Sequence, residues 1–159
     1  MIIVEGIDRV GKTTYCKELS KFLNIPILTL PRPGEDGLKC SDKFIMGLYQ
    51  VEVVVEFAIL GFNFIIDRSY PSELVYSKVA NRETFPEKYY ALDRKLMPFA
   101  SIIYLAPNYT NIYDRWLTAG LDPVNIPLLV EEYKRVLSVL KVKTWTVDPN
   151  VGGISEDSV

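Results

Sequence analysis

Glycine, lysine and threonine residues fall near the start of the chain in a spacing that suits phosphate binding. The run Gly6-Ile7-Asp8-Arg9-Val10-Gly11-Lys12-Thr13 follows a short apolar stretch and opens a helical pattern. Gly6 and Gly11 let backbone N–H groups close around phosphate oxygens, where a Cβ would block the turn or the ligand. Lys12 then offers an ammonium to the β and γ phosphates, and Thr13 offers a hydroxyl to Mg²⁺. We expect a nucleoside triphosphate to contact Gly6, Asp8, Arg9, Val10, Gly11, Lys12, Thr13 and Thr14.

A second group of charged residues follows another apolar run, Phe64-Ile65-Ile66, which ends in Asp67 and Arg68. A carboxylate at the end of a buried strand can hold the Mg²⁺ shell opposite Thr13, and Arg68 would then face the phosphates. Arg9, inside the loop, can reach the transferring phosphoryl group as an arginine supplied in cis. The predicted catalytic residues are therefore Arg9, Lys12, Asp67 and Arg68, and the predicted metal ligands are Thr13 and Asp67. The competing interpretations are a solvated loop arginine and a structural ion pair at the strand end.

These motifs resemble those of thymidylate kinases, whose first strand ends in Glu-Gly-x-Asp. Here Val4-Glu5-Gly6-Ile7-Asp8 matches that opening, and Asp67-Arg68-Ser69-Tyr70 with Tyr76 is similar to the family's Asp-Arg-Tyr region. Pro31-Arg32-Pro33-Gly34 is similar to the family's Arg-Glu-Pro-Gly loop. The resemblance runs from residue 1 to about residue 148. It implies ATP-dependent phosphorylation of a deoxynucleoside monophosphate, dTMP above all, and it implies a homodimer.

By the same resemblance, Asp8 would bond the 3′-hydroxyl of the acceptor and Arg32 would contact its phosphate. The residues expected to bind the acceptor are Asp8, Arg32, Phe44, Gln50, Arg68, Tyr70 and Tyr76. For the aromatic members, plain core packing is the competing interpretation. The chain departs from the family at Gly47, which replaces an expected arginine, and at Arg32, which stands one residue closer to the glycine. The acceptor base therefore stays open.

Composition restricts the kind of protein further. A length of 159 residues, with 48% apolar and 24% charged residues, suits one globular domain over residues 1–159. The net charge of -2 argues against a surface that tracks a nucleic-acid backbone. The chain has no histidine, which excludes mechanisms with a histidine base or ligand, and two cysteines are too few for a disulfide framework. Small-molecule nucleotides are the expected partners.

The start of the chain does not resemble a signal peptide, so we expect a cytoplasmic protein. The longest apolar stretch, Val51 to Phe64, contains Glu52, Glu56 and Asn63 and is too short to span a bilayer. Membrane insertion is therefore not expected.

The elements that must position these residues alternate short β-rich runs with longer helical patterns, as in parallel βαβ units. Near-continuous apolar runs predict strands at residues 2–5, 25–30, 62–66, 101–105 and 143–147. Helices are predicted at 12–23, 42–60, 71–80, 86–97, 109–119 and 127–140, with Ser41 as the cap of the second. The expected fold is α/β, a three-layer P-loop NTPase sandwich with a five-stranded parallel sheet flanked by helices. Residues 115–126 would form the lid, and residues 149–159 a loose tail.

Two other functions stay open. A deoxyribonucleoside kinase of the same fold would suit Ser69, because Asp67-Arg68-Ser69 resembles a Glu-Arg-Ser motif of those enzymes. An acceptor hydroxyl prefers a general base, however, and the sequence offers no evident one, whereas an acceptor phosphate is already a nucleophilic anion. The second alternative is a non-catalytic P-loop module. Because the chain has no Asn-Lys-x-Asp run, which switch GTPases use for guanine, ATP is the favoured nucleotide.

Overall fold

The computed structural model describes residues 1–30 and 40–148, and the side chains of residues 40–46 lie outside this description. The strands are β1 (Ile2–Glu5), β2 (Ile27–Leu28), β3 (Ile65–Asp67), β4 (Ser101–Leu105) and β5 (Lys143–Val147). The helices are α1 (Lys12–Leu23), α2 (Cys40–Ile59), α3 (Tyr70–Val79), α4 (Pro86–Leu96), α5 (Tyr109–Thr118) and α6 (Asn125–Val139). The elements alternate as βαβ units should.

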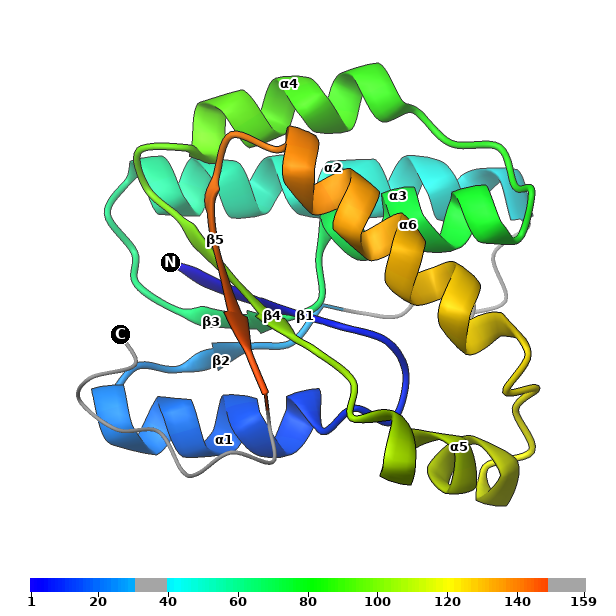
Figure 1. The fold of residues 1–159 in the computed structure, drawn as a ribbon. Helices are drawn as coiled ribbons and strands as arrows, with labels where there is room; N and C mark the ends of the chain where they lie inside the picture. Colours follow the sequence, from blue (N-terminus) through cyan, green and yellow to red (C-terminus); the bar gives the residue numbers. More distant parts are fainter. Residues whose placement is uncertain (31–39, 149–159) are drawn as a thin grey trace.

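The strands form one parallel sheet in the order β2-β3-β1-β4-β5. Helix α1 covers one face, and α2, α3, α4 and α6 lie on the opposite face (Figure 1). Helix α5 stands at the end of the sheet, close to the start of α1 (Figure 1). The fold is therefore the predicted three-layer α/β sandwich.

The core explains why the apolar runs become strands. Ile3, Ile65 and Ile102 are fully buried on neighbouring strands, and Leu19 of α1 and Val136 of α6 are fully buried as well. A parallel sheet covered on both faces requires such residues on both sides of each strand. Burial of these side chains, each worth roughly 1.5–3 kcal/mol, holds the layers together.

Most element bounds agree with the sequence-based expectation within two residues, but three details differ. Strand β3 begins at Ile65 and not at Phe62, whose side chain is 59% exposed in the turn that follows α2. Strand β2 is two residues long and pairs only with β3. Ser41 lies inside α2, so its assignment as the cap of that helix is wrong.

Across residues 1–30 and 40–148, no helix combines the length and the apolar content needed to cross a bilayer.

Candidate active site

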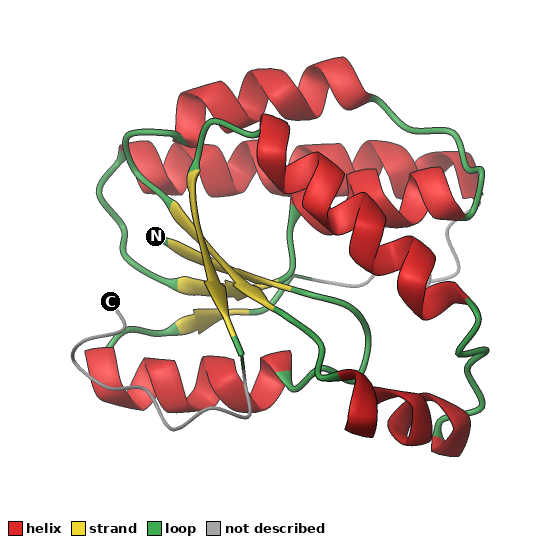
Figure 2. Ribbon diagram, viewed as in Figure 1, coloured by secondary structure: helices red, strands yellow, loops and turns green. Residues whose placement is uncertain are grey.

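The candidate site lies where the carboxyl ends of the strands meet. Strand β1 is the middle strand, with β3 on one side and β4 on the other, and Val4 is in register with Asp67. In open parallel sheets, ligands bind at the carboxyl ends where the strand order reverses. The loop that leaves β1 turns back toward the start of α1 and passes beside α5 (Figure 2). The predicted phosphate loop therefore occupies the position that the topology favours.

The shape of the loop depends on its glycines and on one unusual arginine. Gly6 has φ +147, and a Cβ there would stand 2.8 Å from the carbonyl oxygen of Leu105. Gly11 has φ +105 and precedes the first turn of α1 without a side chain that could cap it. Arg9 has φ +64, a left-handed conformation that costs a side-chain-bearing residue energy. The first-turn N–H groups of α1 are thus left for an anion.

Lys12 begins α1 and is 7% exposed. Its ammonium donates a hydrogen bond to the carbonyl oxygen of Ile7 at 2.7 Å. Burial, together with the nearby Arg68 guanidinium, outweighs the surrounding carboxylates and lowers the pKa of Lys12 to about 8. A buried ammonium beside a phosphate loop gains the counter-charge it lacks when a polyphosphate binds.

Thr13 and Asp67 are brought together as the sequence predicts. The Thr13 hydroxyl donates a hydrogen bond to Asp67 Oδ2 at 2.7 Å. Both groups are hard oxygen donors, and Mg²⁺ at a nucleotide site uses one or two such protein ligands and takes the rest from phosphates and water. The described residues contain no group of three or more acidic, cysteine or histidine side chains that could hold a metal by themselves. The pair fits a Mg²⁺ that arrives with its nucleotide.

Asp8, Arg68 and Tyr76 form a cluster at the mouth of the loop. Arg68 donates to Asp8 Oδ1 at 2.7 Å, and the Tyr76 hydroxyl donates to Asp8 Oδ2 at 3.0 Å. The Arg68 guanidinium also lies over the Tyr76 ring, 5.0 Å from its centroid. Burial opposes the charge of Arg68, but Tyr76, Tyr133 and the carboxylates nearby raise its pKa, so the guanidinium stays cationic. Arg68 therefore pairs with Asp8, and not with Asp67 as the ion-pair interpretation supposed.

Glu5 is a polar residue of this region that the sequence-based prediction missed. It ends β1, is fully buried, and accepts hydrogen bonds from the Ser69 N–H, the Ser72 hydroxyl and the Tyr133 hydroxyl. Burial raises the pKa of Glu5 against the opposing effect of the hydrogen bonds from Ser72 and Ser69 and of the cations Arg68 and Lys12. The sequence does contain a signal for Glu5, because it is the one charged residue of β1 and ends an otherwise apolar strand.

The raised pKa of Glu5 predicts how stability changes with pH. Because the folded protein holds the Glu5 proton more tightly than the unfolded chain, ionisation above pH 4.5 costs stability as the pH rises toward the folded-state pKa. Glu5→Gln, which keeps the shape and cannot ionise, is expected to gain Tm relative to wild type over that range. Thermal denaturation of both proteins from pH 4.5 to pH 8 checks this. A Tm difference that does not change with pH would contradict it.

The remaining predicted site residues fall into three groups. Tyr70 is fully buried, and its hydroxyl donates to Asp93 at 2.6 Å, so its assignment as an acceptor-binding residue is wrong and it belongs to the core. Arg32 and the Phe44 side chain lie outside the described residues. Gln50, predicted to bind the acceptor, lies in α2.

Helix α5 contributes two residues that the sequence-based site lacks. The Trp116 indole N–H donates to the carbonyl oxygen of Asp8 at 2.6 Å, and the Arg115 guanidinium donates to that of Arg9 at 3.3 Å. Trp116 is 4% exposed, whereas Arg9 and Arg115 are both exposed. Arg115, at the start of the segment predicted to form the lid, thus lies beside the predicted catalytic arginine.

Comparison with known proteins gives structural relatives. No protein-family model matches the chain, and no curated protein matches its sequence. Among solved structures, it is similar to the YorR protein of Bacillus subtilis in complex with phosphorylated GDP, with 25% identity and a TM-score of 0.71 over 99% of this chain and 89% of that one. Deoxyadenosine kinase from M. mycoides with bound dATP is 18% identical, with a TM-score of 0.60 over 95% of this chain and 92% of that one.

A gluconokinase from Sinorhizobium meliloti is 14% identical, with a TM-score of 0.54 over 95% of this chain and 83% of that one. None of these three is named as a thymidylate kinase, so that finer resemblance stays a prediction. The chain has the fold of P-loop kinases. That the loop from Gly6 to Thr13 binds the nucleotide stays a prediction.

Proposed function

We propose that this protein transfers the γ-phosphoryl group of ATP to a deoxynucleoside monophosphate, with dTMP as the first candidate. The observation that carries the proposal is the cluster of Asp8, Arg68 and Tyr76 at the mouth of the phosphate loop. It offers a guanidinium to an acceptor phosphate and a carboxylate to a sugar hydroxyl within one hydrogen-bonded group. An acceptor nucleotide needs both.

Phosphoryl transfer requires the protein to position the two reactants and to supply positive charge. An oxygen of the acceptor phosphate attacks the γ-phosphorus in line, its new bond to phosphorus forms, the bond to the β–γ bridging oxygen breaks, and ADP leaves with that electron pair. Lys12 and Arg9 supply cations to the moving group, and Arg68 holds the acceptor phosphate. Bound Mg²⁺, which Thr13 and Asp67 would hold, supplies charge neutralisation on the phosphates.

A deoxyribonucleoside kinase is the second candidate, and Glu5 is the observation that favours it. A sugar hydroxyl must lose a proton when it attacks, and a buried carboxylate with a raised pKa is suited to take that proton. The three hydrogen bonds that Glu5 accepts from the protein weigh against this role, because they occupy both of its oxygens. The fold similarity to deoxyadenosine kinase is compatible with this candidate.

A coupled assay of ADP release separates the candidates. With MgATP as donor, dTMP, dUMP, dGMP and dCMP are compared with thymidine, deoxycytidine and deoxyadenosine. We expect turnover with at least one monophosphate and expect Glu5→Gln to retain it, because a phosphate acceptor needs no base. Turnover with nucleosides alone, lost in Glu5→Gln, would establish the second candidate instead. ATP binding without transfer to any acceptor would indicate a non-catalytic module.

A further inference from the structure

Four successive carbonyl groups of the phosphate loop each accept a hydrogen bond from a side chain. From Gly6 to Arg9, the donors are the Tyr133 hydroxyl at 3.1 Å, the Lys12 ammonium at 2.7 Å, the Trp116 indole N–H at 2.6 Å and the Arg115 guanidinium at 3.3 Å. Three of these four donors come from α5 and α6, more than a hundred residues along the chain from their acceptors. The loop is thus fixed from outside as well as by its own glycines.

Fixed carbonyl groups matter because a phosphate loop works through its N–H groups. For those groups to converge on an anion, the carbonyl groups between them must turn outward. An outward carbonyl that is buried needs a donor, since an unpaired one costs free energy. The positive φ values of Gly6, Arg9 and Gly11 show how far this loop departs from ordinary backbone. External donors stabilise such a conformation against relaxation.

We propose that Trp116 is a positioning residue, which holds the phosphate loop in its anion-binding conformation through the carbonyl group of Asp8. The proposal rests on the donor half of the proposed function, the binding of ATP by this loop, and not on the identity of the acceptor. Of the two donors on α5, Trp116 makes the stronger hydrogen bond. Its side chain is buried, its N–H donates to the Asp8 carbonyl oxygen at 2.6 Å, and an indole N–H can only donate. Arg115 is exposed, and its hydrogen bond is longer.

Asp8 connects Trp116 to the residues that are proposed to bind the acceptor. Trp116 holds its carbonyl group, the Tyr76 hydroxyl accepts from its N–H at 3.1 Å, and Arg68 holds its carboxylate. Both peptide groups of Asp8 are therefore fixed, one by α5 and one by α3. A shift of α5 would re-aim the loop amides and the Asp8 carboxylate together.

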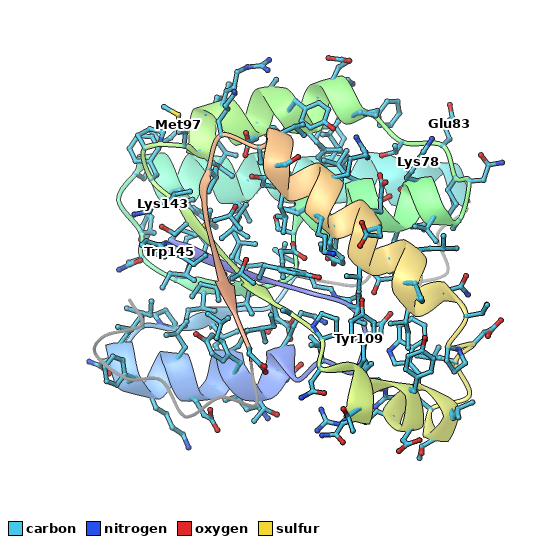
Figure 3. All side chains as sticks on the ribbon, viewed as in Figure 1. Lys78, Glu83, Met97, Tyr109, Lys143 and Trp145 are labelled. Carbon is cyan, nitrogen blue, oxygen red and sulfur yellow. The ribbon has the colours of Figure 1, made fainter. Side chains whose placement is uncertain are left out.

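The test compares two conservative tryptophan substitutions, since the chain contains two tryptophans. Trp116→Phe removes the indole N–H and keeps an aromatic side chain, and Trp145→Phe is the matched control. Trp145 projects from β5, away from α5 and the loop (Figure 3), where the Lys143 ammonium lies 3.9 Å from its ring centroid. Calorimetric titration with MgATP and with inorganic tripolyphosphate, both without acceptor, gives the affinities.

We expect Trp116→Phe to weaken both ligands by the same factor, about tenfold, because the loss falls on the phosphate contacts that they share. Trp145→Phe is expected to bind both as wild type does. If folded Trp116→Phe binds both ligands within twofold of the control, Trp116 only packs and the proposal is overturned.

A second measurement decides the matter if Trp116→Phe does not fold. In Trp145→Phe, Trp116 is the single tryptophan, and its indole N–H bonds directly to the loop. Tripolyphosphate is expected to shift its emission with the same midpoint as the calorimetric titration. An unchanged emission at saturation would refute the coupling. Because no acceptor is present, a failure here is distinct from a failure of dTMP as substrate, and wild type that binds no ATP would instead refute the proposed function.

Discussion

Replacing Arg9 by alanine is expected to lower kcat by about 10³-fold and to change the affinity for ATP only a few-fold. Arg9 stands within the loop with an exposed side chain, so its guanidinium can follow the charge of the moving phosphoryl group. The left-handed backbone at position 9 is strained for any residue that has a Cβ, so alanine leaves the strain of the loop unchanged. Steady-state kinetics with a monophosphate acceptor and calorimetric ATP binding measure the two effects separately.

Arg115→Ala is the matched control for Arg9→Ala. It removes an exposed guanidinium that donates a hydrogen bond to the carbonyl group of Arg9. We expect a much smaller loss of kcat in this variant. If Arg9→Ala turns over normally and Arg115→Ala does not, the catalytic arginine belongs to α5 and the assignment of Arg9 is wrong.

Replacing Lys12 by methionine is expected to abolish turnover and, without nucleotide, to make the protein more stable at pH 7. The pKa of Lys12 lies near 8 in the folded protein against 10.5 in the unfolded chain, so its charge costs stability at neutral pH. Methionine fills the space of the stem without the charge, for an expected gain on the order of 1–2 kcal/mol. That gain should diminish as the pH rises from 8 toward 10.5, because wild type itself becomes more stable there.

Thermal denaturation of Lys12→Met and wild type, with and without MgATP, measures both the gain in stability and the loss of nucleotide binding. Lys17→Met, which changes an exposed lysine of the same helix, is the control and should leave Tm and turnover near wild type. Saturating MgATP should reverse the order of the two Tm values, because only wild type gains binding energy from it. A lower Tm for Lys12→Met without nucleotide would show that its bond to the Ile7 carbonyl group outweighs the burial of its charge.

Local sequence signals were enough to predict β1, the start of α1 and the loop between them. The apolar run of β1, the glycines and the start of α1 adjoin one another in the sequence, so one motif defines both the elements and the loop between them. The parallel sheet followed from apolar runs that are buried on both faces. The start of β3 was predicted three residues too early, because apolarity alone does not separate the exposed Phe62, which lies outside the strand, from the buried Ile65 that begins it.

Contacts between distant segments could not be predicted in the same way. Tyr70 and Tyr76 are the same residue type six positions apart, yet one is in the core with Asp93 and the other is at the loop with Asp8. Trp116 resembles any buried aromatic residue of an amphipathic helix until its partner, 108 positions earlier, is known. The side chains that donate hydrogen bonds to the Glu5 carboxylate likewise come from α3 and α6.

The central place of β1 in the sheet has a consequence for how the protein is made. Strand β1 is translated before the strands that it pairs with, which begin at residues 65 and 101, and the loop after it is held by side chains at residues 115, 116 and 133. During synthesis, β1 cannot pair until β3 and β4 have been made, as is general for strands whose partners lie far along the chain. The phosphate-binding motif is thus translated before the segments that hold it, and the loop gains all four of its side-chain donors only after residue 133 has been made.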